Sequence, residues 1–177
     1  MRYGSRRSCA ALPVLLLALV LSAACAGTDE AGETDTATVE RVADGDTLVL
    51  IGGSRVRLVQ IDAPELGEGE CYAEASAREL AALADTGTRV TLEADPRLDD
   101  VDIHGRLLRY VYEGDVNVNV ELVLRGAAAA YLFRGELGRH ADALLAATEE
   151  ARAEYRGMWG ACRVTWTRDR PVTTRSR

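Results

Sequence analysis

The sequence predicts an α+β domain, mainly β, in which five strands close into an OB-type barrel accompanied by about three helices. Three observations predict this class. Strand-like runs occur three times early in the chain and twice in the middle, a helical segment separates the third run from the fourth, and two helical segments follow. No internal repeat interrupts this order. A chain of 177 residues fits one such domain with additional segments.

The first three predicted strands form a meander. They cover the runs TVERV, TLVLI and RVRLVQI, which are rich in β-branched and other apolar residues. Ala-Asp-Gly-Asp at residues 43–46 separates the first two runs, and Gly-Gly-Ser at residues 52–54 separates the next two. Turns this short join neighbouring antiparallel strands, so we expect the runs to pair in sequence order.

A helix is predicted from residue 72 to residue 85. Ala73, Ala77 and Leu80 recur at helical spacing and would share one apolar face. Gly87 follows as a stop signal, because glycine readily adopts the left-handed conformation that ends helices.

Strand character returns in residues 89–94 and 106–112, which flank a loop rich in carboxylates. Two helical segments complete the predicted domain. We expect Asn119 to cap the first of them, which ends at Gly126, and the second to cover residues 139–156.

Residues 1–25 are expected to form an export signal, because arginines precede an apolar stretch that is too short for a stable membrane span. The stretch ends in Leu-Ser-Ala-Ala-Cys, which resembles a bacterial lipobox and makes Cys25 the expected lipidation site; an ordinary cleaved signal is the alternative. Residues 26–36 are small and acidic and predict a flexible tether. The domain itself is expected at residues 37–162, in an exported protein that is either a cell-envelope lipoprotein, held to the membrane by this lipid, or extracellular.

Four cysteines occur, of which Cys9 and Cys25 belong to the signal and its lipobox. Cys71 and Cys162 remain in the domain. Two thiols in an exported protein favour one disulfide, and two free buried cysteines are the alternative. A cross-link between positions so far apart would restrict the unfolded chain by about 4–5 kcal/mol on the chain-entropy model.

The chain has 21 basic and 28 acidic side chains, and without the three arginines of the signal its net charge is −10. This charge disfavours a general attraction to nucleic acid. Residues 163–177 differ, since they contain five arginines and one aspartate. We expect this arginine-rich tail to be disordered and solvated, with a nucleic-acid contact as the alternative.

Charged residues gather in three short segments: residues 44–47, 57–65 and 102–106. The middle segment is unusual, because an apolar strand carries Arg57 in its interior and Asp62 at its end, where an unpaired buried charge costs several kcal/mol. A surface ion pair would be one way to satisfy these charges. Strict alternation places these two residues on opposite faces, so the strand must bend, and Pro64 is expected to provide the bend.

Other kinds of site fit poorly. Asp100 begins a segment that resembles an EF-hand loop, but its twelfth position is Val111 rather than Glu. His104 and His140 are the two histidines, and without HExxH or CxxC motifs they do not indicate a zinc site. The absence of GxSxG argues against a serine hydrolase. His140 is expected to be an ordinary residue on the surface of a helix.

Together the three charged segments, in this order and at this spacing, resemble the thermonuclease family typified by staphylococcal nuclease, over about Thr38 to Cys162. The resemblance implies calcium-dependent cleavage of phosphodiester bonds in DNA or RNA, with little sugar specificity and with 3′-phosphate products. His104 and Phe133 stand where the family often has tyrosines. The implied site roles are Asp46, Asp62 and the main-chain oxygen of Ala63 as calcium ligands, Asp44 as their support, Arg57, Glu65 and Arg106 as catalytic groups, and Tyr131 as a nucleotide contact.

Elementary chemistry agrees with these roles. Calcium takes six to eight oxygen ligands, which carboxylates, a carbonyl, water and phosphate can supply. Glu65 can hold or deprotonate the attacking water while two guanidinium groups meet the phosphate oxygens. Two other classes stay open, namely a non-catalytic OB module that binds nucleic acid or another ligand, and a structural envelope lipoprotein. The presence of Arg57, Glu65 and Arg106 disfavours both, and we expect a monomer whose partner is its nucleic-acid substrate.

Overall fold

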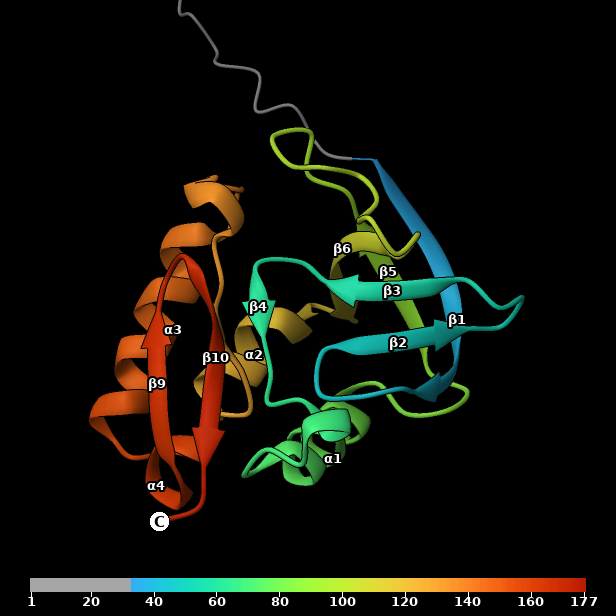
Figure 1. Cartoon of the computed structure of the whole chain (residues 1–177). Helices are drawn as coiled ribbons and strands as arrows, with labels where there is room; N and C mark the ends of the chain where they lie inside the picture. Colours follow the sequence, from blue (N-terminus) through green and yellow to red (C-terminus); the bar gives the residue numbers. More distant parts are fainter. Residues whose placement is uncertain (1–32) are drawn as a thin grey trace, which may run out of the picture.

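The computed structural model describes residues 33–177 (Figure 1). The predicted export signal, the lipidation of Cys25 and most of the predicted tether lie outside the described residues. No helix within residues 33–177 has the length and apolar character needed to cross a membrane.

Five strands form the predicted closed barrel: β1 (Thr34–Val42), β2 (Thr47–Leu50), β3 (Arg55–Leu58), β5 (Arg89–Glu93) and β6 (Leu107–Glu113). Neighbours pair antiparallel in the order β3, β2, β1, β5, β6. A parallel pairing of β3 with β6, with Val56 opposite Leu107, closes the ring. The strand β7 (Val116–Asn117) extends the sheet beyond β6. The barrel therefore mixes antiparallel and parallel pairs.

Three helices accompany the barrel, as predicted: α1 (Ala73–Leu83), α2 (Val118–Leu124) and α3 (Ala141–Ala153), followed by the single turn α4 (Met158–Ala161). Each of the three helices buries an apolar face against the core of the barrel. Leu80 of α1, Leu122 of α2 and Leu144 of α3 are fully buried there. Burying a leucine side chain stabilises a fold by about 1.5–3 kcal/mol, so these contacts hold the helices to the barrel.

The cap of α2 differs from the prediction. Asn117, and not Asn119, caps the helix, because its side chain accepts a 3.1 Å hydrogen bond from the main-chain N–H of Val120. Asn119 is fully buried instead. Its amide group donates to the carbonyl of Val59 at 2.9 Å and accepts from the N–H of Val111 at 2.9 Å. It therefore joins α2 to the barrel wall.

A short strand, β4 (Ile61–Asp62), follows β3 and pairs antiparallel with β8 (Ala129–Ala130). The expected bend between Arg57 and Asp62 occurs at Gln60, and not at Pro64. Gln60 has φ of 60°, in the left-handed region that most residues avoid. Its side chain accepts a 2.6 Å hydrogen bond from the Tyr110 hydroxyl and donates a 2.8 Å bond to the carbonyl of Glu136, and these bonds hold the bend.

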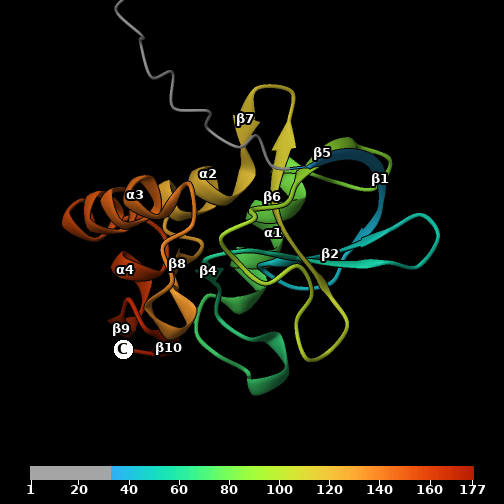
Figure 2. The same cartoon turned by 90° about the horizontal axis from the view of Figure 1, so that it is seen from above.

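The C-terminal segment is ordered, so the expectation of a disordered tail is wrong. Its strands β9 (Arg163–Thr167) and β10 (Arg170–Arg175) form an antiparallel hairpin. In both views the hairpin lies on the side of α3 and α4, with β4 between it and the barrel (Figures 1 and 2). A disulfide between Cys71 and Cys162, whose Cα atoms are 6.0 Å apart, ties the base of the hairpin to the segment before α1. The disulfide that the cysteine count favoured is thus present.

Candidate active site

The Asp44-Gly45-Asp46 turn leads into β2 and packs against α1. Glycine is required at its centre, because a Cβ atom on Gly45 would lie 2.4 Å from Oγ of Ser76 and 2.7 Å from Cβ of Ala63. Asp44 accepts a 3.1 Å hydrogen bond from the N–H of Asp46. The carboxylate of Asp46, a residue only 2% exposed, accepts a 3.2 Å hydrogen bond from the N–H of Ala63. This close packing fixes the Asp46 carboxylate beside β4.

Arg57 on β3 contacts the two aspartates expected to bind metal. Its Nη1 forms an ion pair with Oδ2 of Asp46, and its Nη2 lies 2.7 Å from Oδ1 of Asp62. Nη2 also donates to the carbonyl of Ile61 at 3.2 Å. The bend at Gln60 makes these contacts possible, because it brings Asp62 to the face of the chain that Arg57 occupies. The guanidinium of Arg57 is therefore paired with two carboxylates and is not an unpaired buried charge.

One guanidinium group does not balance all the nearby carboxylates. Burial lowers the pKa of Arg57, but Asp46 and Asp62 raise it above its ordinary value, so the guanidinium stays charged. Burial and repulsion from Asp46 raise the pKa of Asp62, against the effect of Arg57. Burial and then the charge of Asp46 also raise the pKa of Asp44. The site therefore carries excess negative charge, which a cation would stabilise.

Glu65 follows β4 and lies at the exposed edge of this cluster. Burial and then the charges of Asp46 and Asp44 raise the pKa of its carboxyl group, and Arg57 and Arg106 lower it. The charges of Asp46, Asp44, Arg57 and Arg106 therefore all act on the Glu65 carboxyl group. A carboxylate with a raised pKa and solvent access suits a general base.

Arg106 reaches the cluster from the loop before β6. Its Nη1 lies 3.4 Å from the hydroxyl of Thr47, the residue that follows Asp46. Asp102 holds this side chain, since its Oδ2 accepts a 2.7 Å hydrogen bond from Nε of Arg106. The other oxygen of Asp102 accepts 2.9 Å bonds from the N–H groups of Arg106 and His104. Sequence reasoning assigned Asp102 no role, although an Asp-x-x-x-Arg pair inside a charged loop could have suggested one.

Tyr131 lies beside the cluster, one residue after β8, and its N–H donates to the carbonyl of Gln60 at 2.9 Å. Burial and then the charge of Asp62 raise the pKa of its hydroxyl group. Its ring meets the ring of Phe133 edge to face, with centroids 6.3 Å apart. The guanidinium carbon of Arg134 lies 4.8 Å from the centroid of the Phe133 ring. An aromatic and cationic surface therefore adjoins the charged groups.

The hairpin contributes a contact that the sequence did not predict. The N–H of Val172 donates a 2.8 Å hydrogen bond to Oδ2 of Asp62. Arg57 contacts the other oxygen of the same carboxylate, so Asp62 is held from both sides.

The residues present fit a calcium ion. Asp46 and Asp62 both contact the guanidinium of Arg57, so their carboxylates lie close enough to share one cation, and the main chain of Ala63 lies next to both. These donors are all oxygens, which calcium prefers. Within residues 33–177 no three Asp, Glu, His or Cys side chains gather as a metal-binding group. The remaining positions would therefore be filled by main-chain, water or phosphate oxygens.

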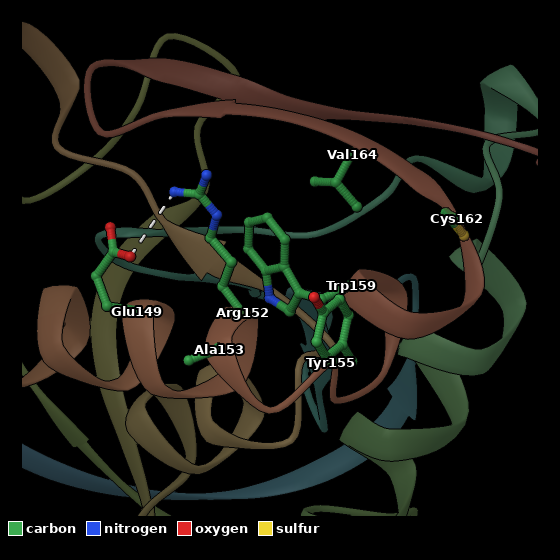
Figure 3. Close-up of a pocket in the computed structure, with 7 residues that line it drawn as sticks. All are labelled: Glu149, Arg152, Ala153, Tyr155, Trp159, Cys162 and Val164. Atoms are coloured by element: carbon green, nitrogen blue, oxygen red, sulfur yellow. Dashed lines mark ion pairs between the residues drawn. The ribbon is translucent and has the colours of Figure 1, made fainter.

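A surface hollow of about 460 Å³ lies away from these residues, between the end of α3, α4 and β9 (Figure 3). An ion pair between Glu149 and Arg152 lies along it, with Trp159 and Tyr155 beyond. None of the predicted catalytic or metal-binding residues lines this hollow, so it is not the candidate active site.

Comparison with known proteins identifies the family of this chain. A model of the family described as staphylococcal nuclease homologue matches residues 55–161. An uncharacterized endonuclease of Haemophilus influenzae is 32% identical over 153 residues, covering 84% of this chain and 76% of the relative. The micrococcal nuclease of Shigella flexneri is 35% identical over 134 residues, covering 68% and 71%. The thermonuclease of Staphylococcus intermedius is 31% identical over 143 residues, covering 75% and 79%.

Fold and family together give the class, which is a nuclease built on a closed five-stranded barrel, and in this chain Arg57 contacts two buried carboxylates beside β3. The chain belongs to the staphylococcal nuclease homologue family, because the family model matches more than half of it and relatives above 30% identity align over most of both chains.

Proposed function

We propose that this protein is a calcium-dependent nuclease that hydrolyses phosphodiester bonds of DNA, RNA or both. The observation that supports this most is the contact of one largely buried guanidinium, Arg57, with two buried carboxylates, Asp46 and Asp62, whose charges together with that of Arg106 act on Glu65. A structural ion pair would not require this number of converging charges.

The metal site consists of Asp46, Asp62 and the main-chain oxygen of Ala63, and Asp44 supports it through its hydrogen bond to the N–H of Asp46. When bound, calcium would neutralise the carboxylates and polarise an oxygen of the substrate phosphate. Family membership supports calcium as the metal.

The protein's own residues carry the proton and the phosphate charge. Glu65 binds the attacking water and accepts its proton as the new bond to phosphorus forms. Arg57 and Arg106 donate hydrogen bonds to the phosphate oxygens, on which negative charge grows in the transition state. The bond from phosphorus to the 5′ oxygen breaks, and this oxygen takes up a proton from solvent water, which leaves a 3′-phosphate and a 5′-hydroxyl. Tyr131 contacts the neighbouring nucleotide.

The test is a cleavage assay with the full chain. Single-stranded DNA, duplex DNA and RNA are each mixed with the protein, either with calcium or with a chelator. We expect cleavage only with calcium and a loss of about 100-fold or more in the Glu65→Gln variant, since general bases contribute about 10²–10⁴-fold.

Glu68→Gln is the matched control. Glu68 is exposed in the short turn after Glu65, and its substitution changes the net charge equally, so its rate should equal that of the wild type. If no substrate is cleaved in calcium, the protein is a non-catalytic binding module instead. If the cleavage rate falls equally in both glutamine variants, Glu65 is not the general base.

We also propose that the protein is exported and acts as a monomer, attached to a membrane through Cys25. The Cys71–Cys162 disulfide supports export, because structural disulfides persist mainly in oxidising compartments. Membrane fractionation of the Cys25→Ser variant tests the anchor. A membrane-bound fraction equal to that of the wild type would exclude lipidation at this residue.

A further inference from the structure

We propose that the hairpin β9–β10 is a binding surface for the phosphate backbone of a nucleic acid that extends beyond the active site. This inference rests on the proposed function and deepens it. It uses arginines of the segment that follows the part of the chain matched by the family model, residues 55–161.

The first observation is the chemistry of the outer face of the hairpin. Arg163 lies opposite Arg175, Thr165 opposite Thr173, and Thr167 opposite Arg170, and all six residues are exposed. Each of these side chains can donate hydrogen bonds, and none of the six is a carboxylate. Arginine and threonine are among the side chains that contact phosphate oxygens in complexes with nucleic acids.

The second observation is that these arginines lack ion-pair partners. Eight of the 13 arginines within residues 33–162 form ion pairs. Among the described residues no carboxylate pairs with Arg163, Arg168, Arg170 or Arg175. Like charges directly opposite on neighbouring strands destabilise a sheet, as Arg163 and Arg175 must here. An anionic ligand would remove this repulsion.

The third observation is the contrast in charge. Residues 33–162 carry 13 arginines and 25 acidic side chains, a net charge of −12, whereas residues 163–177 carry a net charge of +4. The rest of the domain repels a polyanion, so attraction at contact distance must come from a local cationic surface. The hairpin is such a surface.

The fourth observation connects the hairpin to the active site. The carbonyl of Arg168, at the hairpin turn, accepts a 2.6 Å hydrogen bond from the N–H of Leu132, the residue after Tyr131. The indole of Trp166 donates a 2.7 Å bond to the carbonyl of Ala130. From Arg168 to Arg163 the strand covers five residues, or about 17 Å. The arginines therefore extend from Tyr131, the predicted nucleotide contact, toward the disulfide. A nucleic-acid strand lying along this length would place several of its phosphates on the hairpin.

The test measures binding without cleavage. Full-length oxidised protein in a chelator is titrated into a fluorescent single-stranded DNA of about 20 nucleotides, longer than the site of one OB fold. Anisotropy gives Kd at several salt concentrations from about 50 to 200 mM. The variant replaces the four hairpin arginines, R163Q, R168Q, R170Q and R175Q. We expect weaker binding and a slope of log Kd against log salt that is smaller by about 3, because each phosphate contact contributes about 0.7 for single strands.

The control variant replaces four exposed arginines of the barrel side, R41Q, R55Q, R78Q and R89Q, and so changes the net charge equally. We expect it to keep the wild-type slope. Equal effects of the two variants would show a general charge effect and overturn the proposal, as would no effect of the hairpin variant. Circular dichroism checks that each variant is folded.

Two further measurements distinguish a membrane ligand from a nucleic acid and binding from cleavage. The binding of the same proteins to vesicles that contain anionic phospholipid is measured. If the hairpin variant loses vesicle binding but keeps DNA binding, the hairpin is a membrane-binding surface instead. Cleavage is assayed separately in calcium. If the hairpin governs binding but no substrate is cleaved, this inference stands and the proposed function fails.

Discussion

Val172 and Asp62 are 110 residues apart in the sequence and joined by a 2.8 Å hydrogen bond from a main-chain N–H to a buried carboxylate. The register of the hairpin explains why the N–H of Val172 can donate to a residue outside the hairpin. The pairing of β10 with β9 shifts between Arg170 and Thr173, so Val172 has no partner in the ladder. A β-bulge thus directs one N–H group at a predicted metal ligand.

We predict that Val172→Pro, which removes this donor, raises the calcium concentration needed for half-maximal cleavage by about 10- to 100-fold, the usual cost of losing a partner of a metal ligand. Val172→Ala is the control, because it keeps the N–H and loses only packing. Calcium titrations of the cleavage rate compare the two, at equal folded fraction. If both variants have the same midpoint, the hydrogen bond does not position Asp62.

Arg57→Lys should lower the cleavage rate by about 10²–10⁴-fold, because lysine keeps the charge but cannot meet two phosphate oxygens with a planar group. The structure adds a second expectation, since a lysine cannot bridge Asp46 and Asp62 as the guanidinium does. The melting temperature in a chelator should fall, and calcium should restore part of it. A normal rate with lowered stability would mean that Arg57 is only structural.

Gly45→Ala should disrupt the site through a clash rather than through chemistry. The added Cβ would lie 2.4 Å from Oγ of Ser76, so the turn that carries Asp46 must move. A displacement of about 1 Å can cost about 100-fold in rate. Gly67→Ala is the control, because a Cβ there meets no atom within 4 Å. The cleavage rates of the two variants are measured at saturating calcium. A wild-type rate for Gly45→Ala would show that the turn tolerates the shift.

Asp102 should act as a positioning residue for Arg106. Burial raises the pKa of Asp102, but hydrogen bonds from Arg106 and His104 outweigh this effect and lower the pKa below its ordinary value of 3.8. A lowered folded-state pKa gives stability that is present above the unfolded value and lost as the pH falls through the folded one. The difference in free energy of unfolding between the wild type and Asp102→Asn should therefore be constant near neutral pH and should disappear in acid.

The cleavage rate gives Asp102→Asn a second readout. The rate should fall without a large change in KM, because Arg106 would lose its fixed orientation in the transition state. Asp100→Asn makes the same charge change in the same loop, where Asp100 pairs with Arg109, and should keep the wild-type rate. A wild-type rate in Asp102→Asn would leave this carboxylate a purely structural role.

Reduction of the disulfide should destabilise the whole domain. Cys71 and Cys162 are 91 positions apart, so on the chain-entropy model the bond contributes about 4–5 kcal/mol. This corresponds to a decrease of about 8–20 °C in melting temperature. Thermal unfolding with and without reductant measures it, and the double serine variant should not respond to reductant. An unchanged melting temperature in wild-type protein would show that the folded barrel does not depend on the bond.

The sequence predicted the barrel well because its signals are local. Apolar alternation and short glycine turns specify neighbouring strands within a few residues of each other. The bend at Gln60 carries no such signal, since a glutamine with positive φ is held by distant partners, Tyr110 and Glu136. Proline was the visible candidate, and the prediction therefore placed the bend at Pro64.

The hairpin was mispredicted for a different reason. Its inward residues, Val164 and Trp166 on one strand and Val172 and Thr174 on the other, do alternate with polar ones. This alternation of apolar and polar residues could have predicted strands. The five arginines indicated a solvent-exposed tail instead. The contact of Val172 with Asp62 could not be predicted from the sequence. Every residue except proline has the same main-chain N–H, so the residue type does not show which N–H will bind a distant carboxylate.

The distance of 110 residues between Asp62 and Val172 also orders events in time. Ribosomes add about 5–20 residues per second, so roughly 5–20 s separate the synthesis of the carboxylate from that of the N–H that holds it. During that interval a growing chain already contains Arg57, Glu65 and soon Arg106, yet Asp62 lacks its second support. The hydrogen bond from Val172 to Asp62 can therefore form only after β10 has been synthesised.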